Sequence, residues 1–235
     1  MASNFEIVAL FDLDGTLLRA GDPVHHAAFE HALRVVFGAD VALADLELAG
    51  QLDLAITLRA LAGRGIEVTG DDPRVREVMT IMGRYYRLRV SGEERAGWVL
   101  DGVVELLRKL RAAGLATVVA SGSAREVAEA KLASAGLDDY FTAGAFGDEA
   151  DDRPALLRLA VASAAKRYRR NFTLANGVVI GDTPADIEAA RAIGARVVAV
   201  ATGRFSTDQL DEHGPDATFT DLSNADAVIK AILRG

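Results

Sequence analysis

The sequence has no cysteine among its 235 residues, which excludes disulfide bonds, thiolate nucleophiles and cysteine-bound zinc. Basic residues are fewer than acidic ones, 26 against 34, so the net charge is −8. Binding to nucleic acid or to an anionic membrane surface is therefore disfavoured, although local cations in a cleft can still hold an anionic substrate. No apolar stretch reaches the roughly 20 residues that span a bilayer, and the N-terminus lacks the pattern of a secretory signal. We expect a soluble cytoplasmic protein.

Hydrophobic residues make up 50% of the chain, enough for one sizeable core or for a core domain plus a smaller one. From about Val99 onward, short apolar runs alternate with amphipathic stretches. This alternation predicts an α/β fold, a doubly wound, Rossmann-like parallel sheet with right-handed crossovers. The expected strands are Ile7–Phe11, Leu115–Ala120, a weaker Tyr140–Phe146, Val178–Ile180, Arg196–Val200 and Ala217–Phe219. The expected helices are Asp101–Ala113, Ser123–Ala135, Pro154–Tyr168, one starting at Thr183-Pro184, Thr207–His213 and Asn224–Leu233.

Residues 19–94 interrupt the alternation, because they hold helical patterns and no convincing strand. We interpret this block as an all-helical cap inserted over the carboxyl edge of the sheet, with residues 1–18 and 95–235 forming the α/β catalytic core. The helices expected in the cap are His25–Phe37, Leu52–Ala62 and Arg74 to about Arg89, and the expected hinges are Gly21–Pro23 and Ser91–Gly97.

Two aspartates at the end of the first strand are the most informative feature of the chain. Asp12 and Asp14 follow five apolar residues and precede a Gly15-Thr16 turn. Residues i and i+2 of an extended segment point the same way, so both carboxylates can enter one pocket. Like charges at that spacing raise one pKa unless a cation lies between them, so the pair indicates an acid/base couple or a metal site. The alternative is ordinary turn chemistry at a strand end.

Further polar groups follow the other strands, and ligands of open α/β sheets bind at these carboxyl ends. Each group has a structural alternative: Ser121 could cap a helix, Asp186 could complete a capping box with Thr183, and Arg153 could be solvated. Asp182 is harder to dismiss, because an unpaired buried carboxylate costs several kcal/mol. Together the groups suit phosphoryl transfer, in which carboxylates bind Mg²⁺, one aspartate attacks phosphorus and another handles the proton. A hydroxyl and a fixed cation would hold the phosphate oxygens.

On its Asp-x-Asp-Gly-Thr and Gly-Asp-Thr-x-x-Asp stretches, the chain resembles the haloacid dehalogenase superfamily, in its phosphoglycolate-phosphatase-like branch with a helical cap. The resemblance implies that Asp12 is the nucleophile and Asp14 the general acid/base. It also implies a Mg²⁺ site made by the Asp12 carboxylate, the Asp14 backbone carbonyl and Asp182, with support from Asp186. Ser121 is then the hydroxyl that binds phosphate, and Thr16 and Gly122 are further candidates for substrate binding.

One departure from the family pattern concerns the cation that follows the third strand. The family usually has a lysine before the next helix, but no lysine lies between Lys131 and Lys166. Arg153 is the nearest matching cation, and we assign it to this catalytic and phosphate-binding role as a hypothesis, noting that arginine binds phosphate bidentately whereas lysine is a flexible point charge.

The cap is expected to set the substrate. Gly50, Gln51 and Asp53 lie in a segment that resembles the part of related caps that faces the core site, although it could equally be a simple helix start. His25 and His26 could contact the leaving group or face solvent. The expected activity is Mg²⁺-dependent hydrolysis of a small phosphorylated metabolite by a monomer or homodimer. A β-phosphoglucomutase-like transfer ranks lower, because that type pairs a cap histidine with a cap lysine and this insertion has no lysine. A non-catalytic phosphate-binding protein ranks lower still.

Overall fold

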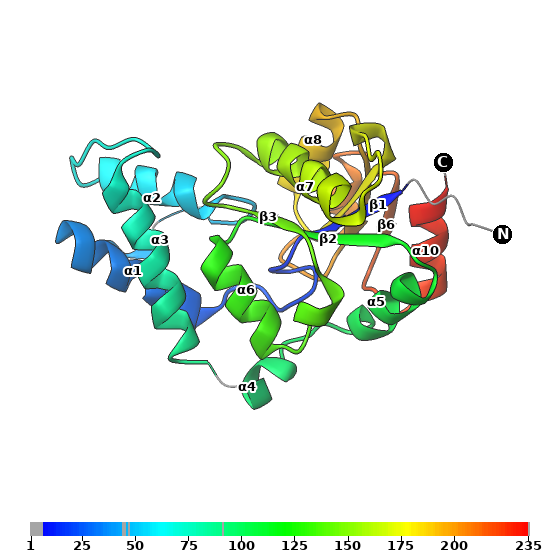
Figure 1. The fold of residues 1–235 in the computed structure, drawn as a ribbon, viewed down its shortest axis with the longest axis horizontal. Coiled ribbons are helices and arrows are strands. Elements are labelled where there is room, and N and C mark those ends of the chain that lie inside the picture. Colours follow the sequence, from blue (N-terminus) through cyan, green and yellow to red (C-terminus); the bar gives the residue numbers. More distant parts are fainter. Residues whose placement is uncertain (1–6, 44–45, 47, 91, 235) are drawn as a thin grey trace.

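Six short parallel strands form one sheet in the computed structural model, which describes residues 7–43, 46, 48–90 and 92–234 (Figure 1). The strand order is β3-β2-β1-β4-β5-β6, with every neighbouring pair parallel. The strands are β1 (Val8–Phe11), β2 (Ala116–Ser121), β3 (Gly144–Phe146), β4 (Gly177–Gly181), β5 (Arg196–Val200) and β6 (Ala217–Phe219). The prediction of a doubly wound α/β sheet is confirmed.

Helices cover both faces of the sheet, and successive strand residues point to opposite sides. Phe11 packs in one apolar cluster with Leu106 of α5, whereas Leu10 packs in a second cluster with Leu157 of α7. Both central strand residues are fully buried, as expected for a parallel sheet covered on two faces. The α-helices from residue 103 onward are α5 (Val103–Ala112), α6 (Arg125–Ser134), α7 (Arg153–Tyr168), α8 (Pro184–Ala192), α9 (Thr207–Asp211) and α10 (Ala225–Leu233).

The inserted segment between β1 and α5 is helical in its described residues. Its helices are α1 (Pro23–Phe37), α2 (Asp53–Ala62), α3 (Pro73–Arg87) and the short α4 (Gly92–Ala96). Figure 1 shows α1, α2 and α3 grouped at one end of the molecule and α10 at the other. These three helices share a third apolar cluster, which also takes in Val127 and Ala130 of α6. We propose the cap of residues 19–94 as a separate unit that packs on the core through α6.

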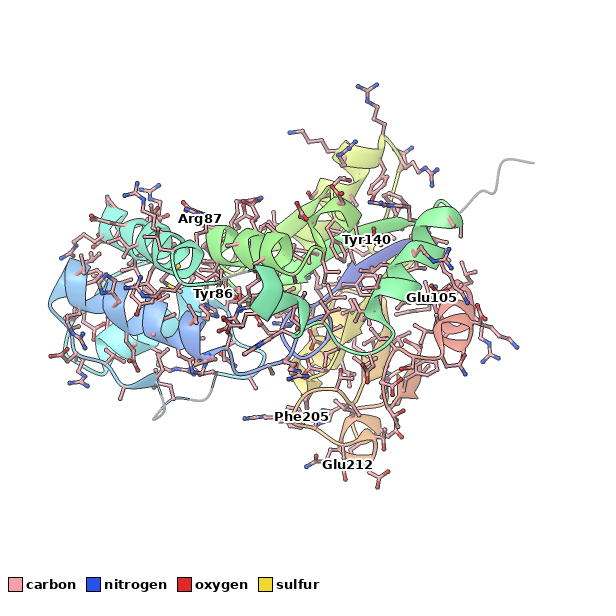
Figure 2. The ribbon with its side chains drawn as sticks, turned by 90° about the horizontal axis from the view of Figure 1, so that it is seen from below. Tyr86, Arg87, Glu105, Tyr140, Phe205 and Glu212 are labelled. Carbon is pink, nitrogen blue, oxygen red and sulfur yellow. The ribbon has the colours of Figure 1, made fainter. Side chains whose placement is uncertain are left out.

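Asp22 joins the two connections between the sheet and the insertion. Its carboxylate caps α1 by accepting from Val24 N, and it also accepts from the Tyr86 hydroxyl at 2.6 Å and from Arg95 Nη2 at 3.0 Å. The Arg95 guanidinium is buried, and it stacks over the ring of Trp98 at 4.2 Å. Figure 2 labels Tyr86 and its exposed neighbour Arg87 near the end of α3. Residues from both connections and from α3 therefore meet around one buried carboxylate.

Several sequence predictions about element bounds are wrong. The third strand covers Gly144–Phe146 only, because Asp138–Tyr140 forms a 3₁₀ turn that Phe141 N closes on Asp138 O. The helix expected from Ser123 begins at Arg125, and its N-cap, Ala124, makes no side-chain capping bond. Much of the second expected hinge is helical, as α4; Ser91, which precedes it, lies outside the described residues. Within the described residues, no helix is both long enough and apolar enough to cross a bilayer.

Candidate active site

Asp12 and Asp182 lie side by side because β1 and β4 are neighbours in the sheet. Phe11 pairs with Ile180 in register, and Asp12 N donates to Ile180 O at 2.9 Å. Gly15 then turns the chain with a φ of +96°, and a Cβ there would lie 2.2 Å from Asp182 Oδ2. The tight turn at Gly15 therefore leaves free the space that the Asp182 carboxylate occupies.

Thr16 supports Asp182 from within the protein. It is fully buried, and its hydroxyl donates to Asp182 Oδ1 at 3.3 Å. Thr16 therefore lies behind the carboxylate rather than on the cavity wall, and this contact fits a role in holding Asp182 better than the expected contact with substrate.

Arg153 lies at the first position of α7 and turns into the site. Its side chain is 8% exposed, and Nη2 donates to Asp12 Oδ1 at 2.8 Å and to Asp186 Oδ1 at 2.5 Å. The alternative of a solvated residue at a helix start is thus excluded. Asp186 both binds Arg153 and caps a helix, because its Oδ2 accepts from the backbone N–H and the hydroxyl of Thr183 in the capping box of α8.

The carboxylates of Asp12, Asp182 and Asp186 offer oxygen atoms that all lie within 4.8 Å of one another, and all three residues are buried. Burial raises the pKa of Asp12 to about 7, against the pull of Arg153 and with the repulsion of Asp186. Burial, followed by the charges of Asp12 and Asp186, also raises the pKa of Asp182 well above its ordinary value. A set of buried carboxylate oxygens with excess negative charge fits a hard divalent cation such as Mg²⁺. Asp12 and Asp182 would hold it, since each Asp186 oxygen already accepts two hydrogen bonds.

Ser121 ends β2 beside this cluster and is buried. Its hydroxyl oxygen accepts from Ser123 N at 3.1 Å, and it does not cap α6, whose N-cap is Ala124. Gly122 lies against the insertion, because a Cβ there would come within 2.4 Å of Gln51 O. The loop that precedes α2 is therefore packed directly onto the end of β2.

A second cluster surrounds Asp14 and includes a residue that the sequence analysis missed. Lys131 of α6 is 1% exposed, and its ammonium donates to Asp14 Oδ2 at 2.6 Å. Burial acts to raise the pKa of Asp14, but the charge of Lys131 and the hydrogen bond that it donates outweigh burial, so this pKa is lowered. The available signal was a lysine on the buried stripe of α6, four residues after Val127 and four before Ala135.

His25 and Asp53 bring the insertion to the same cluster. His25 Nδ1 lies 3.1 Å from Lys131 Nζ, and its Nε2 lies 3.0 Å from Asp53 Oδ2. Since the lysine ammonium can only donate, Nδ1 is the acceptor and Nε2 carries the proton that goes to Asp53. Asp53 also accepts from Ala124 N at 2.8 Å. His25 is therefore held inside the site, contrary to the solvent-exposed alternative.

A cavity of about 610 Å³ lies between the two clusters and the insertion. The sheet side and the insertion both contribute to its wall. The predicted residues that line it are Asp12, Asp14, Ser121, Gly122, Arg153 and Asp182 from the sheet side and His25, His26, Gly50, Gln51 and Asp53 from the insertion. This volume suits a small molecule.

Comparison with known proteins places this geometry in a family. A family model described as haloacid dehalogenase-like hydrolase matches residues 8–194. The chain belongs to this family. As a hydrolase, it is similar to a phosphoglycolate phosphatase of Agrobacterium fabrum, with 29% identity over 220 residues that cover 92% of this chain and 89% of the relative.

Solved structures of other proteins share the fold of this hydrolase. A β-phosphoglucomutase from Clostridium difficile superposes with a TM-score of 0.70 at 17% identity, covering 96% of both chains. A structure from Haemophilus somnus described as a predicted phosphoglycolate phosphatase gives a TM-score of 0.63 at 20% identity, covering 97% of this chain and 100% of the other. At these identities the likeness concerns the fold alone. The expected membership of the haloacid dehalogenase superfamily is confirmed.

Proposed function

We propose that this hydrolase is a Mg²⁺-dependent phosphatase of a small phosphorylated metabolite, and that it works through a phosphoryl group carried on Asp12. The observation that carries the proposal is the convergence of Asp12, Asp182 and Arg153 on one cavity. The name of the Agrobacterium fabrum relative, a phosphoglycolate phosphatase, supports the same activity.

In the first step a carboxylate oxygen of Asp12 attacks phosphorus, and the bond from phosphorus to the leaving oxygen breaks. Asp14 donates a proton to that oxygen, so the product leaves as an alcohol. In the second step Asp14 removes a proton from water, the water oxygen attacks phosphorus, and the bond to Asp12 breaks. Inorganic phosphate leaves, and both aspartates return to their starting forms. A bound Mg²⁺ would neutralise charge on the phosphate oxygens and on Asp12.

Ser121, Gly122 and Arg153 are the groups we assign to the phosphate. Arg153 is already hydrogen bonded to Asp12 and Asp186, so its guanidinium has a fixed position next to the attacking carboxylate. This arrangement supports the hypothesis that arginine here takes the place of the usual lysine. A preorganised cation stabilises charge in the transition state without rearrangement.

The leaving group would lie against the insertion. Gly50, Gln51 and Asp53 line the cavity from the loop before α2, and His25 and His26 line it from α1. Arg153 Nη1 also donates to Gly50 O at 3.4 Å, which ties this loop to the catalytic side. We propose that these residues choose the substrate and exclude water while Asp12 carries the phosphoryl group.

A phosphomutase is the second candidate, and one contact favours it. The insertion has no lysine, but Lys131 from α6 reaches His25 at 3.1 Å. A lysine therefore does accompany the cap histidine, and the sequence argument against a mutase loses its main support. The hydrolase remains the better proposal, because the relative matched along 92% of this chain is named as a phosphatase, whereas the mutase likeness concerns the fold.

The test is a screen of phosphorylated metabolites for phosphate release with and without Mg²⁺, with Asp12→Asn measured in parallel. Asp226→Asn, an exposed carboxylate paired with Lys109, is the matched control. We expect Mg²⁺-dependent release by the wild type and by Asp226→Asn but not by Asp12→Asn. Equal release by wild type and Asp12→Asn would eliminate the hydrolase. Conversion of glucose 1-phosphate isomers without free phosphate would support the mutase.

A further inference from the structure

Lys131 is a buried lysine with three acceptors at the active site. Its ammonium donates to Asp14 Oδ2 at 2.6 Å, to Ser123 Oγ at 3.2 Å and to His25 Nδ1 at 3.1 Å. These contacts account for all three of its protons. Lys131 therefore has no proton left for a substrate, and any effect it has on the reaction must pass through another residue.

Stability alone does not account for this lysine. Burying an ammonium costs several kcal/mol, and replacing a buried ion pair with apolar residues of similar size is often neutral or stabilising. The neighbouring positions on the same stripe of α6 are apolar, with Val127, Ala128 and Leu132 all buried. A leucine or methionine at position 131 would suit such a stripe. The charge is instead directed at Asp14.

The geometry at Asp14 shows what the charge does. Both Lys131 Nζ and Ser123 Oγ donate to the same oxygen, Oδ2, and the Asp14 side chain is still 29% exposed on the cavity wall. A carboxylate held by one oxygen cannot rotate freely about its Cβ–Cγ bond. The other oxygen, Oδ1, is then the one that can meet a leaving group or a water molecule.

We propose that Lys131 is a positioning residue, which fixes Asp14 through Oδ2 so that Oδ1 transfers the proton in both steps. This inference rests on the proposed function, in which Asp14 is the general acid and base. The contact from Lys131 to His25 adds a link to the insertion, because His25 in turn donates to Asp53. The lysine that orients the proton-transfer group is thereby in contact with the part of the chain that covers the substrate.

The experiment compares two substrates whose leaving groups differ in their need for a proton. An alkyl phosphate, such as glycerol 2-phosphate, releases a strongly basic oxygen that must be protonated, whereas p-nitrophenyl phosphate releases a stable anion. We expect Lys131→Met to lower kcat about 100-fold for the alkyl phosphate and less than about 10-fold for p-nitrophenyl phosphate, with KM little changed. Lys131→Arg, which keeps a charge that can bind Oδ2, should recover part of the loss. Lys109→Met, at a surface ion pair, should match the wild type.

A double variant separates positioning from mere destabilisation. If Lys131 acts through Asp14, then Lys131→Met in an Asp14→Asn background should cause almost no further loss, because the group it positions is already gone. Equal losses on the two substrates, or additive losses in the double variant, would overturn the proposal. Phosphate release that survives in Asp12→Asn would instead count against the proposed function.

Crystal structures of the wild type and of Lys131→Met give a second test that needs no activity. The proposal predicts that the Asp14 carboxylate leaves its place when the lysine is removed. A carboxylate that keeps its wild-type position and rotamer in Lys131→Met would overturn the proposal. If Lys131→Met does not fold, the same comparison is made with Lys131→Arg, in which the carboxylate is expected to remain bound through Oδ2.

Discussion

Arg153 donates a hydrogen bond to Asp12 at 2.8 Å, although 141 positions separate them in the chain. The contact exists because α7 begins at the carboxyl edge of the sheet, where β1 ends. Burying this guanidinium, whose side chain is 8% exposed, costs desolvation free energy even though it is paired with two carboxylates. Stability alone therefore does not explain its position. The pair Arg153–Asp12 thus connects the fold directly to the proposed chemistry.

Arg153→Ala should lower kcat/KM for a small phosphate ester at least 100-fold, because it removes the fixed cation beside Asp12. It should also destabilise the protein by about 3–5 kcal/mol, since two buried carboxylates lose their partner. Arg153→Lys keeps the charge but loses the several contacts made by one guanidinium, so it should fall between alanine and the wild type. Steady-state kinetics and denaturant titrations measure the two effects. Unchanged turnover in Arg153→Ala would show that the assignment of this residue is wrong.

Mg²⁺ should stabilise the protein more at high pH than at low pH. In the metal-free protein the pKa of Asp12 is raised from 3.8 to about 7, so the folded protein keeps a proton that the unfolded chain releases. The contribution of this group to stability is complete below about pH 4 and is lost as the pH rises to about 7. A cation bound by Asp12 and Asp182 replaces that proton, so the Mg²⁺-induced rise in Tm should be larger near pH 8 than near pH 5. Equal rises at the two pH values would contradict the metal site.

Gly15→Ala should damage the site through Asp182. A positive φ costs an L-residue roughly 1–2 kcal/mol, and here the new Cβ would also lie 2.2 Å from the Asp182 carboxylate. Gly114→Ala is the matched control, because Gly114 also has a positive φ but nothing within 4 Å of the added Cβ. Both variants should lose stability, and Gly15→Ala should in addition lose Mg²⁺ binding, measured by calorimetry. Full Mg²⁺ affinity in Gly15→Ala would show that Asp182 need not lie where the structure has it.

Tyr86→Phe should lower the free energy of unfolding by about 1.5–3 kcal/mol, the usual contribution of a hydrogen bond to a charged group. The hydroxyl it removes donates to the buried Asp22 at 2.6 Å, where both connections to the insertion meet. Tyr85→Phe removes the hydroxyl next to it in the sequence and leaves the stacking of that ring on Arg89 in place. We expect it to change the free energy by less than about 0.5 kcal/mol. Similar losses in both variants would remove the special role given to Asp22.

The sequence predicts the structure correctly where short-range patterns determine the bounds of an element. The strands at Arg196–Val200 and Ala217–Phe219 have the predicted bounds, because apolar runs are bounded by turn residues there. The aspartates at the ends of β1 and β4 could also be placed together, since parallel strands end at the same edge of the sheet.

Long-range contacts set what the sequence could not predict. Ser123 has the spacing of a capping residue, but its hydroxyl is used by Asp14, 109 positions away, so the helix starts later. Lys131 could not be predicted for a similar reason: it lies in an ordinary amphipathic helix, and only the packing of α6 against the insertion brings it to Asp14 and His25. Position along the sequence therefore predicts Arg153 as the cation of the site and gives no indication of Lys131.

The most direct test of the account is to trap the phosphoryl group on the enzyme. Wild-type protein is mixed with Mg²⁺ and a phosphate ester that it hydrolyses, quenched in acid during the reaction, and digested for mass spectrometry. We expect one phosphoryl group on the peptide that contains Asp12, and none in Asp12→Asn or when Mg²⁺ is chelated. Turnover by the wild type with no phosphoryl group on Asp12, together with undiminished turnover by Asp12→Asn, would contradict it.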